Sequence, residues 1–288
     1  MKILACTISA LALFLAAPHA HADKKPVLQQ SQSAEYNVFA GGIHALKSSL
    51  VINEYKNKTY DISMTAKTFG LLGKLAPWEG IFSSKGWINS DEYIVQEHIS
   101  SHIWKGESEA KTYRYNKDKS FVGFGEAHAQ EDVVLKQADH DLTHGTSDAL
   151  TATLNMLSYA AAQNKCEGSV DVFDGKRRFS LVFTPKAEEV LTASAYNAYS
   201  GNAIQCTAEV TPKGGAWHKK PRGWLSIQEQ GRERGTLPTI WIAQLNDNMP
   251  AMPVKVRVKT SYGTLFMHMT SYEAVQDNSV LKTLKLEK

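Results

Sequence analysis

Apolar and polar residues alternate over much of the chain, which is the pattern of β-strands that bury one face. In the segment KTYDISMTAKTF, Tyr60, Ile62, Met64 and Ala66 fall on one face and polar residues fall on the other. VKVRVKT and TLFMHMT near the C-terminus show the same alternation. Strands of this kind are typical of antiparallel sheets, so we expect the chain to form one.

A hairpin is predicted between Cys166 and Cys206. Asp174-Gly175 separates VDVF from RFSLVF, and this dipeptide accepts the positive φ angles of a tight turn. The cysteines at the two ends of the stretch would clip the hairpin to the next strand. Metal binding by the two thiols is the alternative, but no histidine or cysteine partners stand at finger-like spacing.

An apolar stripe with helical spacing follows Ser147 and Asp148, two residue types that cap helix N-termini. The stripe consists of Leu150, Leu154, Leu157 and Ala161. We expect a helix here that ends near Asn164 and packs on the sheet. The prediction is therefore a mainly β fold, in which residues 35–288 form a single β-rich domain with one large antiparallel sheet and one prominent α-helix.

The N-terminus has the features of an export signal. Lys2 precedes the apolar run ILACTISALALFLAA, and Ala20-His21-Ala22 supplies small residues at a cleavage site. Residues 1–22 are predicted to be a signal peptide cleaved after Ala22, and the polar residues 23–34 a flexible leader. The mature protein is expected to have no transmembrane anchor, because no other stretch is apolar enough to span a bilayer. A retained N-terminal anchor is the alternative.

Export changes the interpretation of the cysteines. The chain has three, and Cys6 would leave with the signal, so Cys166 and Cys206 remain as an even pair. Such a pair in an exported protein predicts a disulfide, which stabilises by about 4 kcal/mol in the chain-entropy account for a loop of this length.

A hydrophobic content of 43% is ordinary for a globular protein, and a net charge of +3 is too small to indicate a nucleic-acid partner. The densest polar group comprises Asp139, His140, Asp141 and His144, with His128 upstream. Its spacing matches no metal-binding motif, so we expect a solvated loop, no bound metal and no cofactor. A metal-dependent hydrolase that uses His140 and His144 is the alternative.

Two stretches are candidate binding surfaces. GLLGKLAPW is apolar but interrupted by glycines, and Leu71, Leu72, Leu75 and Trp78 are candidates for a hydrophobic ligand site at the mouth of a sheet. The alternative is a loop that packs on its own core. A basic cluster near two tryptophans is a candidate for binding anionic lipid head groups or an acidic envelope polymer, with a solvated loop as the alternative. Its members are Lys219, Lys220, Arg222, Arg232 and Arg234.

Several stretches together carry a family resemblance. They are YNVFAGGI, Gly86-Trp87-Ile88, Asp148-Ala149-Leu150, VFDGKRRF, YSGNAIQC, TIWIAQL, PVKVRV and YGTLFMHM. They resemble a family of exported bacterial proteins known as a domain of unknown function (three-one-zero-eight), and FDGKRR is the most specific segment. The resemblance implies a periplasmic protein whose sheet curls into an incomplete barrel around a helix, similar to the lipoprotein carriers LolA and LolB. It implies no catalytic residues.

We therefore predict a non-enzymatic periplasmic protein that binds a hydrophobic ligand, either a lipid or an acyl chain, or an envelope protein, and contributes to cell-envelope maintenance. The alternative is a structural or protein-interaction module whose interior is filled by its own side chains.

Overall fold

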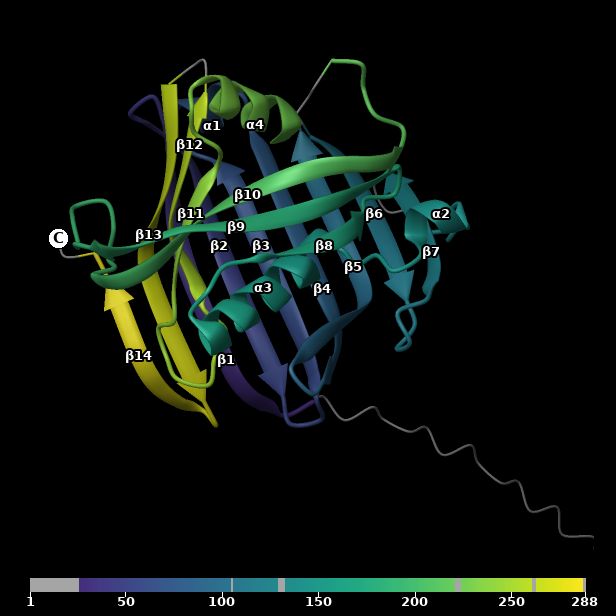
Figure 1. The fold of residues 1–288 in the computed structure, drawn as a ribbon, viewed down its shortest axis with the longest axis horizontal. Coiled ribbons are helices and arrows are strands. Elements are labelled where there is room, and N and C mark those ends of the chain that lie inside the picture. Colours follow the sequence, from purple (N-terminus) through teal and green to yellow (C-terminus); the bar gives the residue numbers. More distant parts are fainter. Residues whose placement is uncertain (1–25, 105, 129–132, 221–223, 261–262, 287–288) are drawn as a thin grey trace, which may run out of the picture.

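In a computed structural model, the strands form one large curved antiparallel sheet (Figure 1). The structure describes residues 26–104, 106–128, 133–220, 224–260 and 263–286. The strands are β1 (Leu28–Ala40), β2 (Ile43–Tyr55), β3 (Thr59–Thr68), β4 (Trp78–Asn89), β5 (Glu92–Trp104), β6 (Glu107–Tyr115), β7 (Phe121–His128), β8 (Gly168–Phe173), β9 (Arg177–Leu191), β10 (Gly201–Gly215), β11 (Thr239–Ala243), β12 (Met252–Thr260), β13 (Gly263–Gln276) and β14 (Ser279–Lys285). The helices are α1 (Gly70–Leu75), α2 (His140–Thr143), α3 (Ala149–Gln163) and α4 (Trp224–Glu233).

The sheet has the order β7-β6-β5-β4-β3-β2-β1-β13-β12-β11-β10-β9-β8, and β14 adds to β13 beside this path. Its two edges, β7 and β8, are not hydrogen-bonded to each other as strands. They approach at one end, where Tyr113 Oη donates to the carbonyl oxygen of Asp174 (2.7 Å) and the ring of Phe173 contacts those of Phe121 and Phe124. The predicted mainly β fold with a single curved, incompletely closed sheet is confirmed.

The first strand begins earlier than the sequence indicates. Leu28 to Ala34 lie in β1 and pair with β2, although this polar segment falls inside the predicted flexible leader, residues 23–34. The leader prediction is wrong for these residues because the inward side chains of the polar segment are buried and bonded. Gln32 donates to the carbonyl oxygen of Pro250 (3.0 Å) and accepts from Tyr272 Oη (2.7 Å). The predicted signal peptide, residues 1–22, lies outside the described residues.

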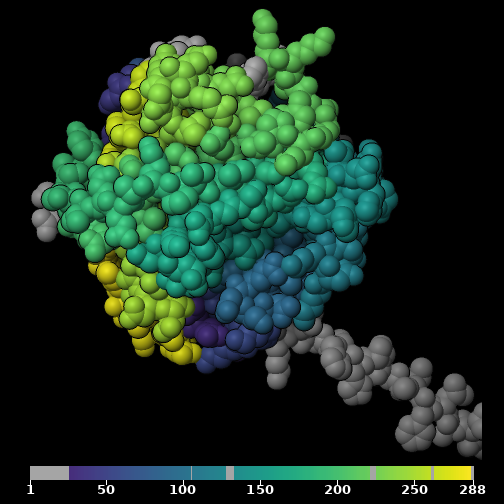
Figure 2. Space-filling view, viewed as in Figure 1, coloured from purple at the N-terminus to yellow at the C-terminus, as the bar shows by residue number. Residues whose placement is uncertain are grey.

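The predicted helix is α3, with Asp148 as its N-cap and Asn164, in the left-handed conformation, at its C-terminus. Leu154 and Leu157 are fully buried, and the helix contacts β3, β4, β5, β8 and β11. In the space-filling view, the teal and green residues of α3, β8, β9 and β10 form a band across the front of the molecule (Figure 2). The helix thus packs on the concave side of the sheet, between the strands β3 to β5 and the strands β8 and β11.

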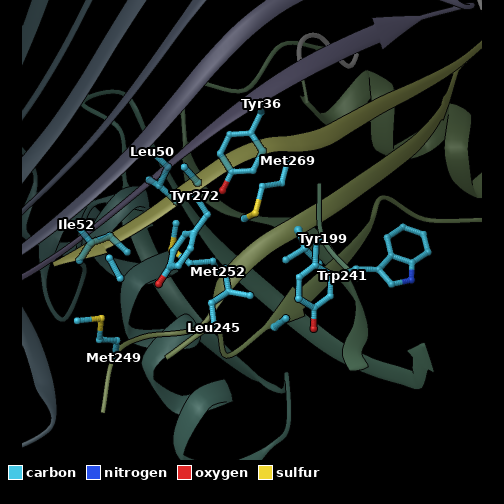
Figure 3. Close-up of a cluster of buried hydrophobic side chains, with 14 of the residues drawn as sticks. Tyr36, Leu50, Ile52, Tyr199, Trp241, Leu245, Met249, Met252, Met269 and Tyr272 are labelled. Carbon is cyan, nitrogen blue, oxygen red and sulfur yellow. The ribbon is translucent and has the colours of Figure 1, made fainter. Parts of the chain in front are cut away.

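Side chains fill much of this interior. Inward residues of β1, β2, β12 and β13 converge in one apolar cluster, in which Tyr36, Leu50, Met252, Met269 and Tyr272 lie close together (Figure 3). A second cluster joins α3 to β9, β10 and β11. No helix within the described ranges is long and apolar enough to cross a membrane.

The disulfide between Cys166 and Cys206 is present, with 6.0 Å between the Cα atoms. Both cysteines are fully buried, and they pack with Met156, Phe183 and Ile242. The bond fixes the segment after α3 to the middle of β10, so it holds the helix, the hairpin of β8 and β9, and the next strand together.

A helix that was not predicted from the sequence follows the predicted basic loop. β10 runs to Gly215, and α4 begins at Trp224. Gln228 anchors α4, because its side-chain amide accepts from the backbone N–H of Val210 (2.7 Å) and donates to the carbonyl oxygen of the same residue (3.1 Å). The amide thereby supplies the backbone hydrogen bonds that a neighbouring strand would make with this part of β10.

Candidate functional site

α1 exposes apolar side chains at one end of the sheet. This helix connects β3 to β4 and contains no buried residue. Leu71 and Leu75 are 66% and 70% exposed, and Leu72 is 37% exposed. Phe69 before the helix and Ile43 at the start of β2 are exposed as well. We call these five residues the rim patch: Ile43, Phe69, Leu71, Leu72 and Leu75.

Local hydrogen bonds hold α1 in this exposed position. The backbone N–H of Phe69 donates to the carbonyl oxygen of Ala45 (2.8 Å), which ties the start of the helix to β2. Thr68 Oγ1 accepts from the N–H of Trp78 (3.0 Å) and donates to the carbonyl oxygen of Ala76 (3.2 Å), which closes the segment after the helix. The leucines are therefore displayed by an ordered structure, and exposed apolar surface of this kind is typical of binding sites.

Trp78 lines a cavity beside the rim patch. It stands opposite Trp104 in the pairing of β4 with β5, and its indole lies over Gly80. A cavity of about 390 Å³ is lined by Trp78, Trp104, His102 and three polar residues of β6. The structure thus places the three predicted leucines together on the rim and Trp78 beside them, over a cavity with an aromatic wall.

The opposite end of the sheet has a more polar opening. A cavity of about 400 Å³ lies between α3, β2 and the segment after β11, and its lining includes Glu54, Lys58 and Asp91. Tyr93 Oη donates to Glu54 (2.5 Å), and Gln30 donates to the other oxygen of the same carboxylate (3.0 Å). Burial, together with Glu54, raises the pKa of Tyr93 well above its usual range, so the phenol stays a donor. This opening suits a polar molecule better than an acyl chain.

The predicted basic cluster is spread along the segment from the end of β10 to the end of α4. Lys219 and Lys220 are exposed, Arg232 pairs with Glu209, and Arg234 donates to the carbonyl oxygen of Gln230 (3.1 Å). Arg222 lies outside the described residues. Because Glu209 offsets the charge of Arg232, the cluster is weaker than the sequence indicates.

A buried Ser-His-Asp group was not anticipated from the sequence. Ser84 Oγ donates to Asp148 Oδ1 (2.7 Å), and His98 Nδ1 lies 3.1 Å from that oxygen and 2.8 Å from Ser84 Oγ. Burial alone would raise the pKa of Asp148, but the His98 imidazole and the hydrogen bonds lower it to about 2. All three side chains are almost fully buried. Only the capping role of Asp148 has a sequence signal.

This group does not have the arrangement of a hydrolytic triad. In a triad the serine and the carboxylate contact opposite nitrogens of the imidazole, and the serine faces the substrate. Here both contact Nδ1, and Ser84 is 1% exposed. The group instead attaches the N-terminus of α3 to β4 and β5.

The histidines of the polar connection lie at the surface. His140 and His144 stack with their ring centroids 4.8 Å apart at the two ends of α2. Among the residues that the structure describes, no group of three or more histidine, cysteine, aspartate or glutamate side chains is arranged to hold a metal ion.

Comparisons with known proteins identify the family. No curated protein sequence matches the chain. The crystal structure of a β-barrel-like protein of domain of unknown function DUF1849 from Brucella abortus is similar with a TM-score of 0.45 and 7% sequence identity, covering 89% of this chain and 99% of that one. The predicted likeness to LolA and LolB is not among these findings and stays a prediction. The family described as protein of unknown function (DUF3108) matches residues 35–270, which is most of the chain, and the protein belongs to this family.

Proposed function

We propose that the protein is a non-enzymatic periplasmic binding protein that holds a hydrophobic ligand, a lipid or acyl chain, at the rim patch and thereby contributes to maintenance of the cell envelope. One observation carries the proposal: an ordered helix presents three leucines and buries none of them. Leaving such side chains in water costs free energy that burial against a ligand recovers.

The filled interior supports a ligand site at the rim rather than inside the curved sheet. Tyrosine, methionine and leucine side chains occupy the space between β1, β2, β12 and β13. A ligand that entered there would have to displace well-packed side chains, which is unfavourable. Beside the rim patch, the cavity under Trp78 and Trp104 offers an apolar wall without that penalty.

The contribution of the leucines to the binding free energy follows from their exposed area. Full burial of a leucine side chain is worth about 1.5–3 kcal/mol. Leu71 and Leu75 are about two-thirds exposed, so each contributes about 1–2 kcal/mol when a ligand covers it. Their joint loss should weaken binding at least about tenfold.

The test is a titration of delipidated protein with a fluorescent fatty acid. The double variant Leu71→Ser/Leu75→Ser should bind at least about tenfold more weakly than wild type, with unchanged stability because both sites are exposed. A matched control is Val190→Ser/Val280→Ser, since these valines are 73% and 61% exposed on β9 and β14. Equal affinity of the leucine variant and the control would overturn the assignment to the rim patch.

The filled core also favours a second candidate, a structural or protein-interaction module. In that case the rim patch would contact an apolar surface of an envelope protein, with no small ligand. Absence of probe binding by wild type would refute the ligand proposal and favour this module.

A further inference from the structure

Six aromatic rings form a continuous strip beside the rim patch, and we call this strip the aromatic belt. Its members are Phe39, His44, Phe69, Tyr196, Phe266 and His268. Ring centroids lie 4.3 Å apart between His44 and Phe69, 4.9 Å between Phe39 and His44, and 5.3 Å between Phe39 and Tyr196. Phe69 belongs to both surfaces, so the belt and the rim patch are contiguous.

The belt lies on the outer face of the sheet. Met267 and Met269 point into the core, so the residues next to them on β13, Phe266 and His268, point the other way. Burial lowers the pKa of both His44 and His268, so these imidazoles are neutral at pH 7 and add to the apolar character of the belt. The belt residues are half-buried or exposed, and Tyr196 is 57% exposed.

Cations flank the belt. Lys47 Nζ lies 4.3 Å from the ring centroid of Phe69, and Lys255 and Arg257 pair across the strands with His268 and Phe266. No Asp or Glu occurs in β12 or in the parts of β1, β2 and β13 that lie near α1, all of which are fully described. These parts are residues 36–40 of β1, 43–47 of β2, 252–260 of β12 and 263–270 of β13.

Carboxylates do approach this face, both on β1 itself and from neighbouring strands. Glu35 of β1 lines a cavity together with Lys47 and Lys67. Glu189 accepts from Trp241 Nε1 (2.7 Å), beneath Lys255 and Arg257, and Glu79 stands opposite Lys67 in the pairing of β3 with β4. The face nevertheless has an excess of positive charge, to which Lys74 of α1 and Lys259 of β12 add.

We propose that the rim patch and the aromatic belt together dock on the surface of an anionic phospholipid bilayer. The leucines of the rim patch would enter the acyl region of the bilayer, and the rings of the aromatic belt would lie between the acyl chains and the head groups. The lysine side chains would extend along the apolar surface to reach the phosphates. An apolar patch surrounded by cations is complementary to an anionic membrane. A hydrophobic protein surface would not require the cations.

This inference deepens the proposed function and rests on it for the role of α1. A protein that takes up an acyl chain at the rim patch would be held with that patch against the membrane that contains the chain. The same leucines would serve both steps, whereas the lysines would serve membrane docking alone.

The experiment measures co-sedimentation of the full mature protein with vesicles of phosphatidylcholine, with and without phosphatidylglycerol. Wild type should bind the anionic vesicles at least about tenfold more tightly than the neutral ones, and salt should weaken this binding. Lys47→Glu/Lys74→Glu should reduce binding to anionic vesicles at least about tenfold. The matched control is Lys117→Glu/Lys165→Glu, two exposed lysines outside the belt and the rim patch.

Equal binding of wild type to the two kinds of vesicle, no binding to either, or an equal loss in the control variant would overturn the inference. A titration without vesicles separates it from the proposed function when it uses the uncharged methyl ester of the fluorescent fatty acid, because Lys47→Glu/Lys74→Glu should retain the wild-type affinity for a probe without a carboxylate. Wild type that binds the probe but no vesicle refutes membrane docking alone. Vesicle binding without probe binding refutes the ligand proposal and supports docking.

Discussion

Asp148→Asn should remove an acid-sensitive part of the protein's stability. Asp148 caps α3 by accepting from the backbone N–H groups of Leu150 (2.8 Å) and Thr151 (3.1 Å), and it also binds Ser84 and His98. Asparagine is nearly isosteric and caps helices as well as aspartate does. The substitution therefore removes the charge of the side chain while it leaves the cap in place.

The expected loss of stability follows from the pKa of Asp148, which is lowered from 3.8 to about 2 in the folded protein. Burial opposes this lowering, and the interaction with His98 and the hydrogen bonds from His98, Thr151 and Ser84 outweigh it. A carboxyl with a lowered folded-state pKa contributes stability above its unfolded-state pKa and loses it as the pH falls through the folded-state value. The shift corresponds to about 2 kcal/mol, present above about pH 5 and lost between about pH 4 and pH 2.

The assay is urea denaturation of wild type and Asp148→Asn at several pH values between 7 and 2, with the disulfide intact. The variant should be about 2 kcal/mol less stable at pH 7, and the two curves should converge near pH 2. Asp139→Asn is the matched control, because Asp139 caps α2 at an exposed position and has no buried imidazole partner in the described structure. A difference between wild type and Asp148→Asn that stays constant across this pH range would refute the reasoning.

Two further predictions concern attachments of α3. Cys166→Ser should lower the free energy of unfolding by about 4 kcal/mol in oxidised protein and change it little in reduced protein. Equal melting temperatures of variant and wild type under oxidising conditions would contradict this. Asn155→Leu should remove two hydrogen bonds of 2.9 Å to the N–H and carbonyl oxygen of Tyr93, costing about 1–3 kcal/mol. Hydrogen exchange at the Tyr93 amide should accelerate, and unchanged protection there would show that another group satisfies it.

The elements that sequence reasoning predicted are those with a local signal. Period-two alternation identified β3, β12 and β13, because each has one face on the core. A capping aspartate followed by a leucine stripe identified α3 to within a residue at each end. An even pair of cysteines, together with the predicted export signal, predicted the disulfide, and the structure contains it.

The features that were missed depend on partners distant in sequence. β1 begins in a polar segment because Gln30 and Gln32 bond to the loop around Pro250. α4 is fixed by Gln228 across 18 residues of chain, and Ser84 meets Asp148 across 64. No local pattern reveals such contacts, because each glutamine or serine resembles a surface residue until the fold brings its partner close.

The same contrast between local and distant contacts bears on where a ligand binds. The leucines of α1 were candidates for a ligand site at the mouth of the sheet, and the alternative was a loop that packs on its own core. Such a loop would bury its leucines. The structure instead attaches α1 through backbone contacts to β2 and the side chain of Thr68, and leaves Leu71 and Leu75 mostly exposed. Since the helix is held by groups other than its apolar side chains, those side chains are not required for folding and remain available for a ligand or a bilayer.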